Sequence, residues 1–197
     1  MRRAPGAGRR RAAGLSASAP REAISAILDR GDDDALVAAA RGAPGRVVRF
    51  LTGRLCSASE EEKGRAVRAL GLLARAPGLL ADDAVLELLR RFLWALNDES
   101  GAVPFGIPEA MGEILAARPG FRPAFLPILC GMLTEEEALQ TGPVERGVIW
   151  AVGRVGPDAL RFSPDLDRVL AEAAERHPDP ETREEAVRAL AGIRGEG

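Results

Sequence analysis

The sequence repeats a short pattern at an interval of about 41 residues. Each copy is a mainly apolar run built around an alanine. The aligned segments are 64–71, 107–112, 147–153 and 185–191, and their alanines are Ala69, Ala110, Ala151 and Ala189, which lie 41, 41 and 38 residues apart. Repeats of this length are typical of solenoids, in which each unit buries its apolar surface only by stacking on the next. A small residue at each equivalent position lets neighbouring helices approach closely.

A second helical stretch precedes each repeated segment. In one of them, Val85, Leu88, Leu89, Phe92 and Leu96 keep the 3.6-residue period of an amphipathic helix. No part of the sequence alternates polar and apolar residues with the period of two that half-buried strands show. The sequence therefore predicts an all-α fold, a right-handed α-α superhelix of about four helix pairs with an N-terminal helical cap. The predicted pairs span 44–75, 82–118, 121–156 and 163–193, and the cap spans 21–29 and 33–41.

Several residues mark where these helices begin. Ser59 and Glu62 have the spacing of a capping box, in which each side chain bonds to the other residue's backbone N–H. Ser163–Pro164 and Asp179–Pro180 both place a capping side chain before a proline, which is favoured at the first helical position. Pro127 lies inside a helical pattern and is predicted to kink or delay that helix, because it lacks a backbone donor.

Charge is distributed unevenly along the chain. Residues 1–19 contain five Arg and no acidic residue, so they carry +5, and because the whole chain carries −2, residues 20–197 carry −7. We expect residues 1–19 to be a disordered Arg-rich tail, or alternatively a basic arm that contacts nucleic acid, and residues 20–197 to form one repeat domain. The tail lacks the apolar segment of a signal peptide. An acidic domain repels a phosphate backbone, which argues against nucleic-acid binding outside the tail.

The residues that most enzymes and metal sites use are scarce. His177 is the only histidine, and it lies in a surface-type Arg-His-Pro-Asp-Pro turn. Cys56 and Cys130 are isolated among apolar neighbours, so both are predicted to pack in the interior as reduced thiols. The sequence has no Gly-rich nucleotide loop and no apolar run long enough to span a bilayer. These features predict no metal, no cofactor, no catalytic residues and a cytoplasmic location.

The repeat interval also predicts which residues lie side by side on the outward surface of the second helices. Two rows of equivalent positions result: Arg68, Glu109, Trp150 and Arg188 form one, and Leu72, Glu113, Arg154 and Gly192 form the other. Packed helices lie about 8–10 Å apart. Arg68 is therefore expected to reach Glu109, and Glu113 to reach Arg154.

The first row suggests a recognition site. Gly106 and Gly147 lie one turn before Glu109 and Trp150, and they are expected to leave an open floor beside the indole. A carboxylate, a guanidinium group, an aromatic face and open space together favour a small pocket or a peptide clamp. The alternative is a solvated surface with weak ion pairs, in which Trp150 packs against the next repeat. The sequence leaves both interpretations open.

A polar loop joins the helices of the second full repeat. Asn97 to Ser100 are four polar residues in a row, and the prolines at positions 104 and 108 stiffen the next part of the loop. The polar side chains are expected either to cap the flanking helix ends or to form a polar lip at the end of the groove. Trp94 lies outside the apolar stripe of its helix, one turn before Asp98. The predicted binding residues are Arg68, Trp94, Asn97, Asp98, Glu99, Ser100, Glu109, Glu113, Arg146, Trp150 and Arg154.

Parts of the chain resemble known repeat families. Asp179–Ile193 is similar to the HEAT-like repeat that is named after phycobilisome lyases, and this resemblance covers most of residues 44–193. Trp94–Gly101, Pro108–Ile114 and Gly147–Arg154 resemble a small bacterial HEAT-repeat family without an assigned activity. Both resemblances imply a fold. Neither implies a reaction, because function depends on sites rather than on folds.

These observations predict a non-catalytic binding scaffold or adaptor that recognises a protein segment or a small ligand on the face formed by the second helices. Nucleic acid is expected only at the Arg-rich tail, and no membrane is expected. The enzyme alternative is a resemblance to HEAT-like DNA alkylpurine glycosylases, which use an aspartate and aromatic residues on a concave face. Trp94, Asp98 and Trp150 are similar in type. Those enzymes need a basic groove, which the charge of −7 disfavours.

Overall fold

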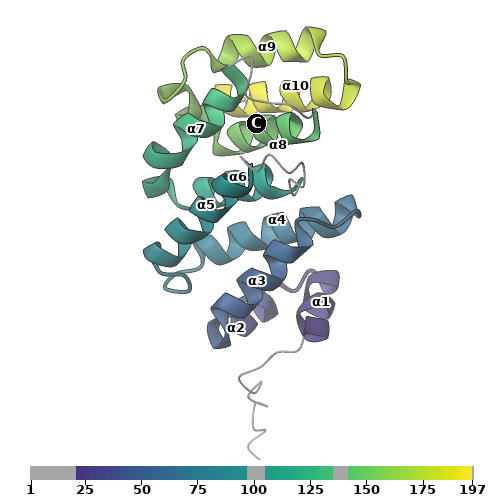
Figure 1. Cartoon of the computed structure of the whole chain (residues 1–197), viewed down its shortest axis with the longest axis vertical. Coiled ribbons are helices and arrows are strands. Elements are labelled where there is room, and N and C mark those ends of the chain that lie inside the picture. Colours follow the sequence, from purple (N-terminus) through teal and green to yellow (C-terminus); the bar gives the residue numbers. More distant parts are fainter. Residues whose placement is uncertain (1–20, 97–104, 135–141, 197) are drawn as a thin grey trace, which may run out of the picture.

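A computed structural model describes residues 21–96, 105–134 and 142–196 of the chain (Figure 1). Within these ranges the secondary structure is helical, with ten α-helices, two short 3-10 helices and no strand. The helices are α1 (Arg21–Arg30), α2 (Asp33–Gly42), α3 (Pro44–Arg54), α4 (Glu60–Arg75), α5 (Asp82–Leu96), α6 (Ile107–Ala117), η1 (Pro119–Phe121), α7 (Arg122–Thr134), α8 (Gly142–Val155), η2 (Gly156–Arg161), α9 (Leu166–Arg176) and α10 (Pro180–Arg194).

The helices form stacked pairs. Each of α4, α6, α8 and α10 packs against the α-helix before it, and these four second helices also pack side by side in chain order. Figure 1 shows the pairs following one another along the long axis of the molecule, with α1 and α2 at the N-terminal end. The predicted all-α solenoid with an N-terminal helical cap is confirmed, and the helices lie close to the predicted ranges.

The core is a continuous band of apolar side chains that runs along the stack. The side chains of Leu70, Phe92, Met111 and Leu126, which come from three successive pairs, are almost wholly shielded from water. Burial of a side chain of this size contributes about 1.5–3 kcal/mol. Because every pair contributes to one band, no pair buries its apolar stripe alone. In the part of the chain that the structure describes, no helix is both long and apolar enough to cross a bilayer.

Two of the predicted helix starts are confirmed. Ser59 caps α4, since its hydroxyl oxygen accepts a hydrogen bond from the backbone N–H of Glu62 at 3.3 Å. The reciprocal half of the capping box is missing, because the Glu62 carboxylate accepts hydrogen bonds from Ser57 at 2.8 Å and Arg54 at 2.7 Å instead. Asp179 caps α10 by accepting two backbone N–H groups of the first turn, at 3.3 and 3.1 Å.

The predicted start at Ser163–Pro164 is wrong. The backbone N–H of Ser163 still donates to the carbonyl of Ala159 in η2 at 3.1 Å, so this stretch continues the preceding turn. The helix α9 begins only at Leu166, after Asp165, whose side chain makes no capping hydrogen bond. Pro127 lies inside α7 and neither delays nor ends that helix.

The second helices meet at small residues. All four repeat alanines are buried. A Cβ added to Gly112 of α6 would lie 2.6 Å from the Cα of Ala151 in α8, and one added to Gly153 of α8 would lie 2.6 Å from the Cα of Ala189 in α10. Each glycine stands two residues after the alanine of its own repeat. Both interfaces therefore place a glycine of one repeat against the alanine of the next.

Gly112→Ala tests this close approach. Alanine is the better helix former by about 1 kcal/mol, but its Cβ would overlap the backbone of α8, which cannot move aside cheaply. We expect the free energy of unfolding, measured by urea titration, to fall by about 1–3 kcal/mol. The control is Gly64→Ala in α4, where the added Cβ would meet only the flexible end of Arg68 at 3.4 Å. That variant should be neutral or more stable, and equal effects in the two variants would contradict the packing.

Candidate binding surface on the second helices

We call the surface that carries Arg68, Glu109, Glu113, Trp150 and Arg154 the second-helix face. Glu113 is its most buried member, with 5% of its surface exposed. Arg154 of α8 makes two hydrogen bonds to the Glu113 carboxylate, from Nε to Oε1 at 2.9 Å and from Nη2 to Oε2 at 3.3 Å. Hydrogen bonding to Glu113 raises the pKa of Arg154. The predicted contact between residues 41 positions apart is confirmed.

Gly71 of α4 makes room for the buried Glu113. A Cβ on Gly71 would lie 2.8 Å from the Cβ of Glu113 and 2.5 Å from its Oε2. The carboxylate therefore rests on the bare backbone of α4, where Arg75 approaches it at 3.9 Å. A carboxylate in this position is stabilised by the forked hydrogen bonding of a guanidinium group.

A hollow of about 280 Å³ opens beside this ion pair. Residues of α1 and α2, Leu28 and Leu36 among them, line one part of it. Arg68 and Arg75 of α4 line another, and the Glu113–Arg154 pair also borders it. Arg68, Arg75 and Arg154 are all exposed to solvent. The full lining has four arginines and three acidic residues, a net charge of +1, beside its apolar side chains.

Glu109 lies one turn before Glu113 on α6, in a different environment. Its carboxylate rests on Gly147 of α8, where an added Cβ would lie 2.8 Å from Oε2. Within the described part of the chain, Oε2 is buried and has no hydrogen-bond partner. Burial raises the pKa of Glu109 to about 7, and the positive charges of Lys63 and Arg146 only partly oppose this rise. A large fraction of Glu109 is therefore neutral near pH 7.

The open floor predicted beside the indole is wrong, because charged side chains fill it. Lys63 of α4 covers Gly106, where an added Cβ would lie 2.9 Å from the Lys63 Cγ, and Glu109 covers Gly147. Lys63 is itself buried, and its Nζ donates to a carboxylate oxygen of Glu60 at 2.7 Å. A long side chain from a neighbouring helix covers each glycine, so no open space remains there.

The predicted contact between Arg68 and Glu109 is also wrong. The Nη1 of Arg68 lies near Gly64, one turn earlier on its own helix. Lys63 and Arg146 are the cations that act on Glu109. The offset between α4 and α6 thus brings Lys63, five residues before Arg68, toward Glu109.

Arg146 and Trp150 occupy successive turns of α8. Arg146 pairs with Glu181 and lies 3.6 Å from Asp179, so its charge is directed at the start of α10. Trp150 is half-buried and packs against the core. The indole therefore has one part in the packing between helices and another part open to solvent.

Trp94 lies apart from the second-helix face. It is on α5, a first helix, and its side chain is 78% exposed. Trp94 and Trp150 belong to different layers of the stack, so the glycosylase-type grouping has no support in the fold. The predicted loop residues Asn97, Asp98, Glu99 and Ser100 lie outside the described residues.

Sequence reasoning missed one buried polar contact. His177 was expected on a surface turn, but its side chain is only 16% exposed. Its Nε2 lies 3.2 Å from a carboxylate oxygen of Glu145, and its Nδ1 accepts a hydrogen bond from the backbone N–H of Asp179 at 3.1 Å. This contact joins the start of α10 to α8. Its partners are 32 residues apart in sequence, so only the packing of the helices reveals it.

The prediction that both cysteines pack in the interior is right for only one of them. Cys130 is buried in α7, and burial raises the pKa of its thiol to about 11, which keeps it protonated. Cys56 is exposed, because α3 ends just before it. Among the described residues, no group of three or more His, Cys, Asp or Glu side chains is arranged to hold a metal ion.

No protein-family model matches the sequence. No curated protein matches it significantly. Among solved structures, it matches an engineered protein of the Northeast Structural Genomics Consortium with 22% identity, a TM-score of 0.48 and coverage of 92% of this chain and 87% of that chain. Two designed armadillo repeat proteins match with 18% identity, TM-scores of 0.45 and 0.47, and coverage of 90% of this chain and 88% of theirs; the second was solved in complex with the peptide (KR)4.

Glu109→Gln tests the buried carboxylate. With a pKa of 4.5 when unfolded and about 7 when folded, Glu109 makes the native state bind more protons between these values. Its contribution therefore favours folding below pH 4.5 and is lost as the pH rises to about 7. The difference between the two pKa values corresponds to roughly 3 kcal/mol in the free energy of unfolding. In urea titrations, the variant should gain stability relative to wild type as the pH rises from about 5 to 8.

The control for this experiment is Glu87→Gln, which removes the same charge from an exposed position on α5. If the difference in stability between Glu109→Gln and wild type does not change with pH, the carboxylate is not destabilised by burial.

Arg154→Ala tests the ion pair with Glu113. It leaves a buried carboxylate with only Arg75 nearby, at 3.9 Å. Because Arg154 is itself partly exposed, we expect a loss of about 2 kcal/mol rather than the full cost of an unpaired buried charge. Adding Glu113→Gln should recover part of that loss, as measured by a double-mutant cycle in urea. Simple additivity of the two single losses would show that the residues are not coupled.

Proposed function

We propose that this chain is a non-catalytic binding scaffold of HEAT-like repeats that acts in the cytoplasm. In this proposal the second-helix face recognises an acidic segment of a partner protein. The face binds through its basic hollow, and Trp150 provides the apolar anchor.

The observation that carries the proposal is the hollow of about 280 Å³ at which arginines from α4 and α8 come together. Arg75 is 3.9 Å from the Glu113 carboxylate, and that carboxylate is already engaged by Arg154 at 2.9 Å. Arg68 is exposed beside it. These guanidinium groups retain N–H donors, and the guanidinium fork matches the two oxygens of a carboxylate.

The shape of the hollow supports a peptide rather than an isolated anion. Half-buried Leu28 and Leu72 line it together with the arginines. Three acidic residues line the hollow as well: Asp32, Asp33 and Glu113. Asp32 is occupied as the cap of α2, where it accepts a hydrogen bond from a backbone N–H at 3.0 Å, and Glu113 is bound by Arg154. A segment with an acidic residue next to an apolar one matches both kinds of lining, because the leucines contact the apolar side chain while the arginines bind the carboxylate.

Glu109 lies on the same face as a buried carboxyl group whose pKa is raised to about 7. A buried polar atom without a hydrogen-bond partner is rare in folded proteins and calls for an explanation. Protonation lowers the cost of burying this carboxyl group, because a neutral carboxyl group is less strongly hydrated than a carboxylate. On the same face, the half-buried indole of Trp150 on α8 offers the kind of anchor that dominates protein interfaces.

The double variant Arg68→Gln/Arg75→Gln tests the hollow. It removes two positive charges from exposed positions, so helix content and melting should stay unchanged. We would select peptides from a random library displayed on phage against the full chain and measure the affinity of the enriched sequences by fluorescence anisotropy. Wild type should enrich peptides that contain Asp or Glu, and the variant should bind them at least about tenfold more weakly.

The matched control is Arg161→Gln/Arg168→Gln, which removes two exposed arginines from η2 and α9 and should bind like wild type. Enriched peptides that lack acidic residues would contradict the proposal. Equal affinity for wild type and the Arg68/Arg75 variant would contradict it as well.

A further inference from the structure

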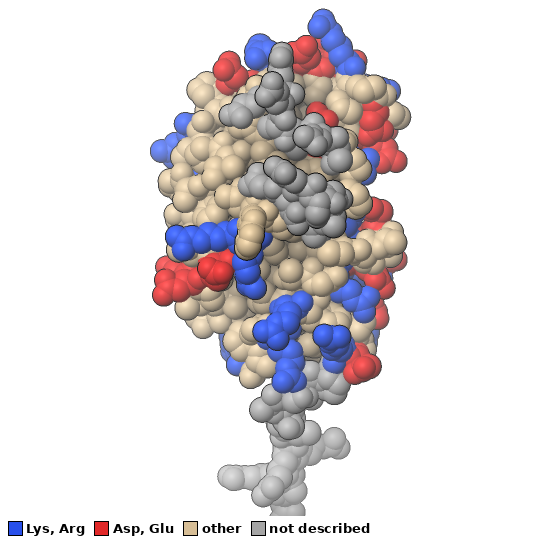
Figure 2. Space-filling view, viewed as in Figure 1, with Lys and Arg blue, Asp and Glu red and all other residues tan. Residues whose placement is uncertain are grey.

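The outward surface of α7 is uncharged, although 28% of the residues in the whole chain are charged. After Arg122, which begins the helix and pairs with Asp158, α7 contains no charged residue. The side chain of Ile128 in α7 is 42% exposed. Figure 2 shows a broad tan area where Figure 1 places α7. We call the exposed apolar residues of this surface the α7 face: Pro123, Ala124, Pro127 and Ile128.

A helix that is apolar on all sides is normally covered on all sides. The inner side of α7 is covered, since it packs against α8 and α9. Cys130 and Leu129 belong to this inner side and are almost wholly buried. The α7 face is the side that the described part of the chain leaves open to solvent. It therefore has the composition of a contact surface rather than of a solvated one.

The neighbouring first helices provide a reference for α7. The buried stripe of α5 recurs in α7 37 residues later, and that of α7 recurs in α9 41 residues later. The buried residues that define this register are Leu88, Leu89 and Phe92 of α5, Phe125, Leu126 and Leu129 of α7, and Leu166 and Leu170 of α9. Equivalent outward positions can therefore be compared between the three helices.

The outward positions of α5 and α9 are mostly charged. Residues equivalent to positions 124, 127, 128 and 131 of α7 are Glu87, Arg90, Arg91 and Trp94 on the α5 side and Asp165, Arg168, Val169 and Glu172 on the α9 side. These positions carry +1 on the α5 side and −1 on the α9 side. Figure 1 shows α5, α7 and α9 following one another along the stack. An uncharged helix thus lies between two charged ones, as in an interface with an apolar centre and a polar rim.

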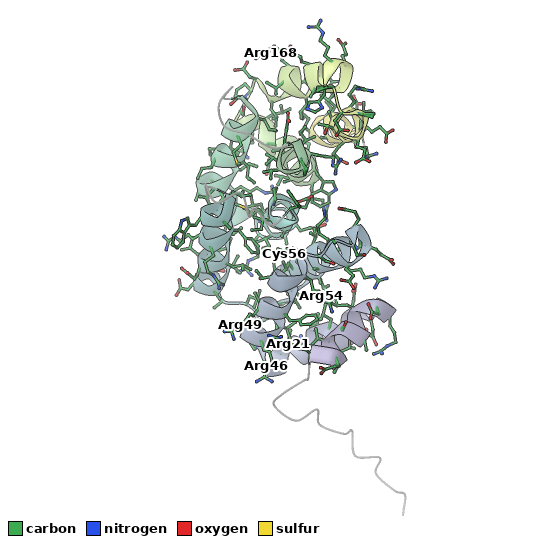
Figure 3. The ribbon with its side chains drawn as sticks, turned by 45° about the vertical axis from the view of Figure 1, so that its right-hand side comes forward. Arg21, Arg46, Arg49, Arg54, Cys56 and Arg168 are labelled. Atoms are coloured by element: carbon green, nitrogen blue, oxygen red, sulfur yellow. The ribbon has the colours of Figure 1, made fainter. Side chains whose placement is uncertain are left out.

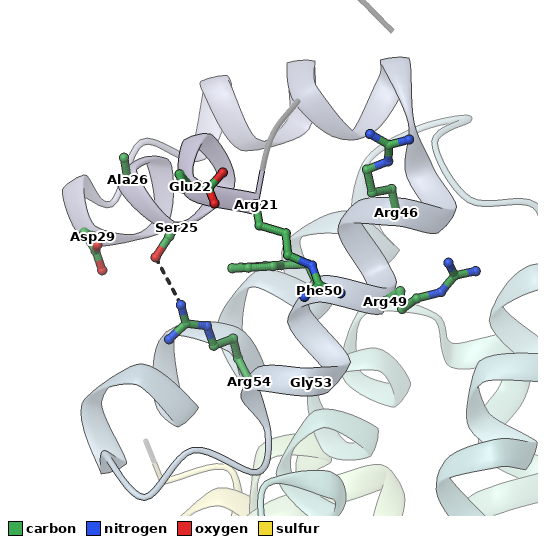
Figure 4. A pocket seen from close by; sticks show the side chains of 10 residues that line it. All are labelled: Arg21, Glu22, Ser25, Ala26, Asp29, Arg46, Arg49, Phe50, Gly53 and Arg54. Carbon is green, nitrogen blue, oxygen red and sulfur yellow. Dashed lines mark hydrogen bonds between the residues drawn. The ribbon is translucent and has the colours of Figure 1, made fainter. Parts of the chain in front are cut away.

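Both ends of the molecule present charge instead. Figure 3 shows four arginines of α1 and α3 at one end and Arg168 of α9 at the other. The arginines of α1 and α3 line a cleft of about 890 Å³ between these two helices (Figure 4). Its aromatic ring, Phe50, already has the guanidinium carbon of Arg54 at 5.2 Å from its centre. The α7 face is therefore an apolar surface with charged regions on both sides of it along the stack.

These charges favour a second copy of the chain as the occupant of the α7 face. In a two-fold contact a surface meets itself, and an uncharged surface does so without like-charge repulsion. A two-fold axis along α7 places α5 of one copy over α9 of the other, which brings a net charge of +1 over one of −1. An anionic lipid surface requires a basic surround, whereas three of the six charged residues at these positions are acidic.

We propose that this chain forms a symmetric dimer in which the α7 faces of two copies pack against each other. Ala124 and Ile128 lie one helical turn apart, so the Ile128 side chain of one copy fits beside the small Ala124 of the other. With 13 residues, α7 is about 20 Å long, and its contact buries less than the roughly 800 Å² per partner of a standard interface. The dissociation constant is therefore expected to be on the order of 10–100 µM.

The dimer leaves the second-helix face uncovered, because α7 is a first helix and the second helices form the other layer of the stack. Each dimer then presents two second-helix faces, which would strengthen the capture of a partner that carries two acidic segments. This consequence rests on the function proposed above. The dimer itself does not, since no residue of the α7 face belongs to the second-helix face.

The test is sedimentation velocity of the full chain at concentrations from about 1 to about 300 µM. Wild type should change reversibly from monomer to dimer across this range. Ile128→Glu and Ala124→Glu each bring like charges into the contact from both copies, so each should raise the dissociation constant at least about tenfold. Both positions are exposed, and melting curves show whether the variants remain folded.

The matched control is Val187→Glu. It introduces the same charge at an apolar side chain of α10 that is 56% exposed, and it should dimerise like wild type. A mixture of equal amounts of Ile128→Glu and Ile128→Arg should associate more tightly than either variant alone, because opposite charges then face each other across the contact.

Three outcomes would overturn the proposal. The first is a wild type that stays monomeric at about 300 µM. If that monomer sediments with phosphatidylcholine vesicles and Ile128→Glu does not, the α7 face binds a lipid surface instead. The second is a folded Ile128→Glu variant that dimerises like wild type. The third is an equal loss of association in Val187→Glu, which would place the contact on another surface.

Discussion

The close approach of the second helices is the constraint on which the rest of the structure depends. Gly112 meets Ala151 and Gly153 meets Ala189, each so tightly that one added carbon would overlap the opposing backbone. Helices held at this separation share one apolar core and keep equivalent positions level with one another. That alignment is why Glu113 reaches Arg154 across 41 residues of sequence.

Glycines on the second helices also make room for buried charged side chains. At two glycines that face a neighbouring helix, a charged side chain lies on the glycine backbone: Glu113 on Gly71 and Glu109 on Gly147. Their situations differ because of what else is in reach. Glu113 is engaged by Arg154, whereas one oxygen of Glu109 is buried without a partner and its pKa rises to about 7. One turn of α6 thus separates a structural ion pair from a carboxylate that titrates near neutrality.

Positive charge is concentrated in two places on an acidic chain. The hollow beside Glu113 contains exposed arginines next to apolar side chains, and the cleft between α1 and α3 contains exposed arginines around Phe50. In a molecule whose residues 20–197 carry −7, such local concentrations attract anions that the rest of the surface repels. The two places differ in their apolar lining, which is leucine-rich in the first and built around one phenylalanine ring in the second.

Periodicity by itself determined the helical class of the fold, its helix pairs and the lateral contact between Glu113 and Arg154, because each depends on the spacing of like residues along the chain. It did not determine the contact predicted for Arg68 and Glu109, since a small offset between α4 and α6 brings Lys63 near Glu109 instead. Three further features appeared only in the tertiary structure: the side chains that cover Gly106 and Gly147, the pairing of His177 with Glu145, and the cleft between α1 and α3. Spacing fixes which residues share a face, but rotations of a fraction of a turn and the reach of long side chains decide which of them touch.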